Sequence, residues 1–318
     1  HSNDSMAMYV NNATRLTIDS SGNVGIGTSS PTATLDVNGT IKLDGNYPVG
    51  SNNVALGDGA LDASLTGASN TAIGSYSLTN NTSGASNTGL GFAALGDTTT
   101  GSFNTALGTS ALENNTTASG NTAVGYVSLT SNTTGTNNVA LGSNSLQPNT
   151  TGSQNTALGK GASASNSTGS NNTSVGFEAL VSSTTASNNT AVGYQAGYAN
   201  TTANNNTTVG YSSLKTNTTG ADNNAFGANA LQNNSTGGSN AAFGQAALYQ
   251  NTTGSSNSSL GTGALQNNTT ASNNTAVGYQ AGYANTTGER NTAMGVQSLY
   301  TNTTGSFNSA FGRTALYF

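Results

Sequence analysis

One interval organises most of this chain. A glycine that follows a large apolar residue recurs every 17 residues, sixteen times, with no insertion or deletion, from Gly57 to Gly312. A constant interval of this kind is typical of a solenoid, in which each repeat is one coil that must stay in register with its neighbours. The sequence therefore predicts a stack of sixteen 17-residue coils over residues 51–318, and these glycines are called the repeat glycines below.

Four positions of the unit carry nearly constant residue types. The residue four before each repeat glycine is always Asn (the Asn row), and the residue directly before it is Leu, Ile, Val, Phe or Met (the apolar row). The residue two before it is Ala, Ser, Gly or Thr (the small row). The residue four after it is Leu (the Leu row), except at Ser163, Gly197 and Gly282. The structural ladder expected from these rows begins with Asn53, Asn70, Asn87, Asn104 and Asn121, and with Gly57, Gly74, Gly91, Gly108 and Gly125.

The length and composition of the unit favour β-structure over helices. Seventeen residues are too few for two packed helices, and Asn, Thr and Gly, about 45 % of the chain, are poor helix formers. The segment before each repeat glycine is predicted to form a short strand, the glycine a turn with positive φ, and the following Ala-Leu the start of a second strand. The predicted fold is an all-β parallel β-solenoid (β-roll). In such a stack, equivalent residues lie about 4.8 Å apart, so we expect an amide ladder from the Asn row and a core filled by the apolar and Leu rows.

The small row bears on assembly. It points to the face of the strand opposite the apolar row, and it excludes every bulky side chain. A solvent-facing position would admit Lys, Glu or Gln, so the pattern predicts close packing against another layer or another chain. Compositional drift in an Ala- and Ser-rich repeat is the alternative interpretation.

Residues 1–50 lie outside the 17-residue phase and are predicted to form a small β connector or cap. Arg15–Asp19 alternates as a strand, Ser20–Asn23 reads as a turn, and Thr34–Lys42 alternates again. The expected organisation is a connector over residues 1–50 followed by a solenoid over residues 51–318.

Charge and composition exclude several functional classes. Only 5 % of the residues are charged, the net charge is −5, and the chain has one His and no Cys. Acid–base catalysis has few groups to use, and six scattered Lys and Arg residues do not make a nucleic-acid surface. The sequence contains no run of about 18 apolar residues and no signal-peptide pattern in residues 1–20, so we expect no membrane insertion. We expect no enzyme activity, no catalytic residues, no cofactor and no metal.

Two segments resemble known families. Asn-Val-Ala-Leu-Gly at Asn53–Gly57 and Asn-Thr-Ala-Val-Gly at Asn121–Gly125 resemble the head repeats of YadA-like trimeric autotransporter adhesins, although those repeats are usually a few residues shorter. Gly22–Pro31 followed by Leu35–Gly39 is similar to a segment of phage tail fibres and bacterial surface fibres. The resemblance implies a left-handed parallel β-roll assembled as a homotrimer, on the outside of a virion or cell.

A few residues are candidates for chemistry or binding. Asp58 and Asp62 form the nearest acidic pair of the solenoid, and solvated surface carboxylates are the simpler interpretation. His1 has no nucleophile beside it in the sequence to serve. Aromatic residues directly after the repeat glycines are candidate glycan contacts, because exposed rings stack on sugars. They include Tyr126, Tyr194, Tyr211 and Tyr279.

Two functions fit these observations. The first is a structural segment of an extracellular fibre, such as a phage tail fibre or a cell-surface adhesin or filament, that forms a rigid rod and contributes to host or surface attachment. Its partners would be two further copies of the chain, other fibre, virion or cell-surface proteins, and surface glycans. The alternative is a binding solenoid for a periodic ligand such as ice or surface glycan. The adjacent Thr residues eight and nine after each repeat glycine do not form a flat Thr-x-Thr array, which disfavours ice.

Overall fold

The computed structural model describes residues 6–10, 13–38, 50–63 and 66–317. These residues form β-strands and turns and contain no helix. The chain divides into two compact units, His1–Gly45 and Asn46–Phe318. The second unit is an all-β parallel solenoid, which confirms the predicted fold class.

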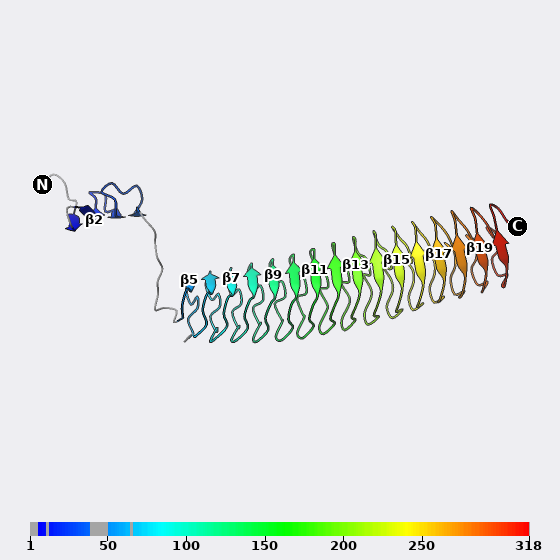
Figure 1. The fold of residues 1–318 in the computed structure, drawn as a ribbon, viewed down its shortest axis with the longest axis horizontal. Coiled ribbons are helices and arrows are strands. Elements are labelled where there is room, and N and C mark those ends of the chain that lie inside the picture. The colour runs from blue at the N-terminus through cyan, green and yellow to red at the C-terminus, as the bar shows by residue number, and fades with distance from the viewer. Residues whose placement is uncertain (1–5, 11–12, 39–49, 64–65, 318) are drawn as a thin grey trace. The chain divides into compact units, whose positions relative to one another are not determined.

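The solenoid contributes one three-residue strand per coil to a single sixteen-stranded parallel sheet, in which neighbours in sequence are neighbours in space (Figure 1). The strands are β5 (Val54–Leu56), β6 (Thr71–Ile73), β7 (Thr88–Leu90), β8 (Thr105–Leu107), β9 (Thr122–Val124), β10 (Val139–Leu141), β11 (Thr156–Leu158), β12 (Thr173–Val175), β13 (Thr190–Val192), β14 (Thr207–Val209), β15 (Asn224–Phe226), β16 (Ala241–Phe243), β17 (Ser258–Leu260), β18 (Thr275–Val277), β19 (Thr292–Met294) and β20 (Ser309–Phe311).

Each coil lies on the next in the register that the 17-residue interval predicts. Leu107 of β8 pairs with Val124 of β9, and the same offset holds from β5 to β20. Backbone hydrogen bonds between coils continue outside the strands, for example from Leu112 N to Ser128 O at 3.1 Å. The turns of each coil are therefore paired along the stack as well, which supplies the stabilisation that an isolated coil lacks.

The predicted second strand is wrong. The Ala-Leu segment after each repeat glycine is a turn, and the Leu residues adopt left-handed φ values, for example 52° at Leu112 and 52° at Leu129. Left-handed residues reverse the chain direction, whereas a strand needs extended φ throughout. A coil with only one strand has to turn through the rest of its 17 residues, so these positions bend the chain.

The predicted inward orientation of the apolar row is also wrong. Ala140, in the small row, has no exposed surface, whereas the side chain of Leu141 beside it is 44 % exposed. The same alternation recurs along β6 to β20, where the middle residue of each strand is buried. The interior of a 17-residue coil is narrow, and only small side chains fit between the strand and the opposite turn. The small row therefore packs inside its own coil and is not the predicted contact with another chain.

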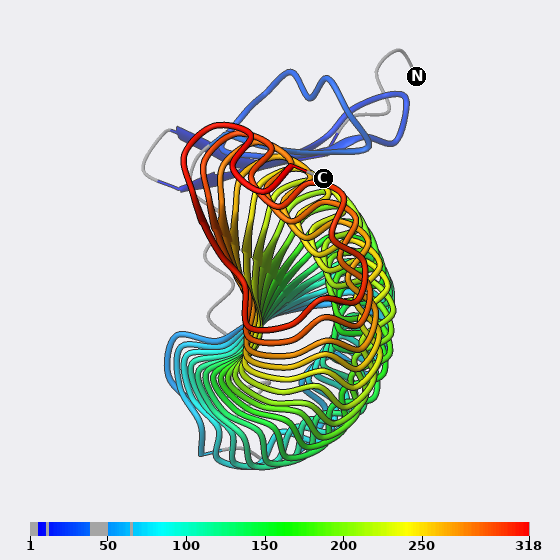
Figure 2. The ribbon, with the colours of Figure 1, turned by 90° about the vertical axis from the view of Figure 1, so that its right-hand side faces the viewer.

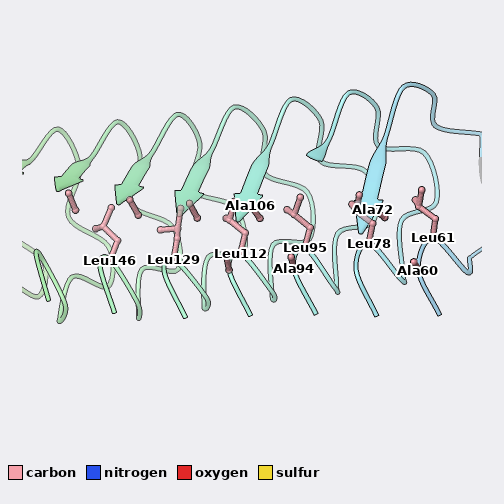
Figure 3. Close-up of a cluster of buried hydrophobic side chains, with 14 of the residues drawn as sticks. Ala60, Leu61, Ala72, Leu78, Ala94, Leu95, Ala106, Leu112, Leu129 and Leu146 are labelled. Atoms are coloured by element: carbon pink, nitrogen blue, oxygen red, sulfur yellow. The ribbon is translucent and has the colours of Figure 1, made fainter. Parts of the chain in front are cut away.

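The core consists of the small row, the Leu row and the residue before each Leu. Figure 3 shows the Leu side chains, among them Leu95, Leu112 and Leu129, stacked one above the other beside the buried alanines. The buried apolar residues form three clusters, which extend over Ala60–Ala162, Ala179–Ala196 and Leu214–Ala310. The predicted burial of the Leu row is confirmed.

The coils do not stack directly above one another. Figure 2, which looks along the solenoid, shows each coil turned slightly and in the same direction relative to the one before it. Parallel strands twist in this way because of the backbone's handedness. Any row of side chains on the outside therefore winds around the long axis of the solenoid.

The N-terminal unit contains a separate four-stranded sheet with the order β1-β2-β3-β4. Its strands are β1 (Met6–Val10), β2 (Ala13–Ile18), β3 (Val24–Ile26) and β4 (Leu35–Val37). β2 matches the predicted first strand, and β4 lies within the predicted Thr34–Lys42, whose last residues fall outside the described part. In the turn between β2 and β3, backbone N–H groups and the Asn23 amide donate hydrogen bonds to Asp19 and hold the pKa of that carboxyl below its usual value.

The orientation of the strand can be tested with two adjacent residues. We expect Ala140→Asp to destabilise the solenoid by about 3 kcal/mol or more, because it buries an unpaired charge. We expect Leu141→Asp to retain native β-structure, because this side chain points outward. Circular dichroism and protease resistance of both variants measure the difference, and equal loss of structure in both would contradict the assignment.

Candidate functional site

The Asn row connects the coils through the side-chain amide. Each Asn oxygen accepts a hydrogen bond from the backbone N–H of the Asn one coil on, as from Asn70 N to Asn53 Oδ1 at 2.8 Å and from Asn121 N to Asn104 Oδ1 at 3.0 Å. In most coils the amide nitrogen donates to a carbonyl of the following turn, as from Asn70 Nδ2 to Gly84 O at 2.9 Å, whereas Asn206 Nδ2 is buried without a hydrogen-bond partner. Asp could not donate the second bond and Ser could not span both, so the geometry accounts for Asn at this position.

The repeat glycines have both conformational and steric reasons to be glycine. Their φ values lie between 111° and 139°, for example 132° at Gly108. A Cβ built on Gly108 would lie 2.6 Å from the carbonyl oxygen of Gly125 in the next coil. Gly57, Gly74, Gly91 and Gly125 are in the same situation. The lack of a side chain at these positions therefore allows the backbones of successive coils to approach closely.

A second Asn ladder was missed in the sequence. The residue seven after the repeat glycine is Asn in most coils, is buried, and donates to the side-chain oxygen of its equivalent in the previous coil, as from Asn132 Nδ2 to Asn115 Oδ1 at 2.9 Å. Its period of 17 is visible in the sequence and is the signal that could have revealed it.

The second ladder is interrupted where Asn is replaced. Ser183 follows Asn166 in this row, and both Asn166 Oδ1 and Ser183 Oγ are buried without a hydrogen-bond partner. Likewise, Thr98 follows Asn81 in this row, and Asn81 Oδ1 and Thr98 Oγ1 are buried without a hydrogen-bond partner. A buried polar atom without a partner costs about 1–3 kcal/mol, so these two sites weaken the stack.

The interruption can be repaired. We expect Ser183→Asn to raise the free energy of unfolding by about 1 kcal/mol, because the new amide can donate to Asn166 Oδ1 and accept from Asn200. Urea denaturation of the full chain measures the change. Ser182→Asn, next to it but outside the ladder, serves as the control, and an unchanged or lowered midpoint for Ser183→Asn would contradict the ladder.

The apolar row forms the most extended feature of the outer surface. Its exposed members include Leu107, Leu141 and Phe311, whose side chains are 42 %, 44 % and 67 % exposed. The other outward position of each strand, three before the repeat glycine, is mostly Thr, and neither position carries a charged residue in any coil. Phe226 and Phe243 of this row stack with ring centroids 4.9 Å apart. The sheet thus presents a continuous uncharged face along the whole solenoid.

The four candidate glycan contacts differ in how much of each ring is accessible. Tyr194 lies between Phe177 and Tyr211, with centroid distances of 5.6 and 5.2 Å and nearly parallel planes, so both of its faces are covered. Tyr126 and Tyr279 are 61 % and 50 % exposed, and within the described part of the chain neither stacks on another ring. Tyr211 has one face covered. A sugar could therefore stack on Tyr126, Tyr279 or the outer face of Tyr211, but not on Tyr194.

This difference gives a test for glycan binding. If surface glycans bind the aromatic positions, Tyr126→Ala is expected to reduce binding on a glycan array by about fivefold or more, since one ring stacked on a sugar contributes roughly 1 kcal/mol or more. Tyr194→Ala is the matched control and is expected to leave binding nearly unchanged. A larger loss for Tyr194→Ala would contradict the stacking geometry.

A second tyrosine stack lies five residues after the repeat glycine and was not foreseen. Tyr283, Tyr300 and Tyr317 have successive centroid distances of 5.2 and 5.1 Å. Burial of Tyr300 in this stack, with Tyr283 and Tyr317 on either side, raises the pKa of its hydroxyl above the ordinary value. The 17-residue spacing of these tyrosines was the signal that could have revealed it.

The remaining candidates for chemistry are Asp58, Asp62 and His1. Asp58 and Asp62 are both exposed on the first coil, and His1 lies outside the described residues. Among the residues that the structure describes, no group of three or more His, Cys, Asp or Glu side chains could hold a metal ion. The same residues include no helix long and apolar enough to cross a membrane.

No protein-family model and no curated protein sequence matches this chain. The geometry of the solenoid and its outer face is therefore the basis for assigning a function.

Proposed function

We propose that this chain is a non-catalytic structural segment of a homotrimeric extracellular fibre, such as a phage tail fibre or a cell-surface adhesin or filament. In this proposal the solenoid is a rigid rod that holds an attachment region away from a virion or cell surface. Other fibre or surface proteins, and surface glycans at the open aromatic positions, are its further partners.

The exposed apolar row carries the proposal. Eight of its sixteen large apolar side chains are exposed and the other eight are half-buried. Together they give a stripe on the order of 1,000 Å², whereas the largest apolar patch of a typical monomer covers about 300–600 Å². A row of this length on a rod matches the surface of another rod and does not resemble a pocket for a small molecule. Further copies of the same chain present the same row with the same 17-residue spacing.

The twist of the solenoid supports a coiled assembly. Because the apolar row winds around the long axis (Figure 2), copies in contact along the row have to wind around a common axis. The number of three copies comes from the resemblance of the repeats to trimeric adhesin heads. Bound together in this way, the uncharged faces of the sheets would lie inside the fibre and the turns outside.

The periodic-ligand alternative has one observation in its favour. The outward residue three before the repeat glycine is Thr in ten of the sixteen coils, and together with the apolar residue two positions later, as in Thr122 and Val124, it forms a Thr-x-apolar array along most of the solenoid. The same twist that suits a coiled assembly makes this array non-planar, which does not suit the flat surface of ice. The fibre therefore remains the proposed function.

Sedimentation of the full chain tests the assembly. We expect a trimer that resists protease, and we expect Leu141→Asp to shift it toward monomers, because three carboxylates would be buried in the contact. Thr151→Asp, in the same coil but on an exposed turn, is the control and should stay trimeric. A folded wild-type monomer would contradict the proposal, and a monomer that lowers the freezing point without changing the melting point would support the ice-binding alternative.

A further inference from the structure

The N-terminal sheet has one apolar face and one more polar face. On one side of the β-bulge at Met8/Tyr9, the strand register places alternate residues of the four strands in two cross-strand rows on one face, and all eight residues of these rows are apolar. The first row is Met6, Ile18, Val24 and Leu35, and the second is Met8, Leu16, Ile26 and Val37. The row between them on the opposite face is Ala7, Thr17, Gly25 and Asp36. The eight apolar residues of the first and second rows are called the connector face.

The connector face is the open side of the sheet. Met6, Met8, Ile26 and Leu35 are 45–59 % exposed, and the other four are half-buried beside them. The opposite, more polar face is covered in part: the loop after β3 lies over Gly25, and Thr17 beside it is buried, whereas Ala7 in β1 is exposed. A Cβ built on Gly25 would lie 2.7 Å from Thr28 O and 3.4 Å from the Cβ of Pro31.

This burial is the reverse of that in a stable single-chain sheet. Thr17 is only 6 % exposed, and its hydroxyl oxygen is buried without a hydrogen-bond partner, whereas the apolar side chains face water. A unit of about 45 residues is near the size below which a chain needs an additional source of stability. Covering the connector face would supply that stability, because each large apolar side chain contributes about 1.5–3 kcal/mol when fully buried.

We infer that the connector face packs against the connector faces of further copies of this chain. This inference rests on the proposed function, in which the solenoids already bring identical chains together. The face contains no charge and no polar side chain, so it is complementary to itself without any matching of charges. Its eight side chains expose on the order of 500 Å², which is less than one side of a standard two-protein interface of about 800 Å². The face alone is therefore too small for a stable assembly, and it forms a second contact that adds to the one along the solenoid.

Thiol labelling tests this inference, because the chain contains no cysteine. Met8→Cys places a thiol on the connector face, and Ala7→Cys places one on the opposite face of the same strand, where the residue is also exposed. In the assembled full chain we expect a water-soluble maleimide to label Met8→Cys about tenfold or more slowly than Ala7→Cys. Adding Leu35→Asp to Met8→Cys should restore fast labelling while sedimentation still shows a trimer.

The outcomes separate this inference from the proposed function. Equal labelling rates in a chain that sediments as a trimer would overturn the inference and leave the fibre proposal intact. Protection of Met8→Cys only after a different fibre protein is added would also overturn it, since the occupant would not be a second copy. A monomer in sedimentation would overturn the proposed function itself.

Discussion

Every residue of the solenoid lies directly beside its own equivalent in the coil above and the coil below, and this self-stacking determines which side chains the chain can use. An Asn amide both donates and accepts, so a column of Asn satisfies itself, and glycine backbones, Leu side chains and aromatic rings also pack well on their own kind. Identical charges about 4.8 Å apart repel, so a charged column is excluded. The low charge of the chain is therefore a consequence of its architecture.

The few charges of the solenoid occur where a neighbour in the next coil is neutral. Glu178 accepts a hydrogen bond from Gln195 at 2.8 Å, Asp97 from Asn80 at 2.9 Å, and Asp222 from Asn205 at 3.0 Å. The cations follow the same rule with aromatic neighbours, since Lys215 lies over the ring of Tyr198 and Arg290 over the ring of Phe307. Single charges are thus tolerated, and the chain supplies an amide or a ring beside each of these five.

The repeat alone predicts the register, the parallel sheet and the buried Leu row, because a fixed interval leaves only one way to stack. It does not predict which face of the strand is inside. Alternation separates Ala140 from Leu141 but assigns neither to the core. The usual rule that large apolar residues are buried fails for the strand, because the Leu row already occupies the interior and leaves room only for small side chains beside it. The left-handed φ of Leu112 was equally hidden, since Leu rarely adopts it. The same holds for the candidate glycan contacts. Tyr194 and Tyr126 both directly follow a repeat glycine, so the sequence does not distinguish them, and only the structure shows which ring faces are accessible.

The three separate core clusters show how much local variation the stack tolerates. The clusters are divided where a missing Leu and a hydroxyl in the small row meet in adjacent coils: Ser163 bonds Ser174 at 2.9 Å, and Gly197 lies next to Thr208. Gly282 replaces Leu next to an alanine of the small row, Ala293, and the cluster there is continuous. One substitution is absorbed by the neighbouring coils, whereas two in contact interrupt the apolar core.

In the strands of both units, small residues lie inside and large apolar residues lie outside. In the solenoid Ala140 is buried and Leu141 is exposed, and in the connector Gly25 is covered while Ile26 faces water. The hydrophobic effect therefore contributes less to folding of the single chain than the composition allows, and much of the available apolar surface remains to be covered by other chains. Under the proposed function, hydrogen bonds between coils define the shape of each chain and burial between chains stabilises it. Assembly would then add stability to chains that already have the solenoid fold, and a substitution on the outer apolar row would lower stability by reducing the number of chains held together.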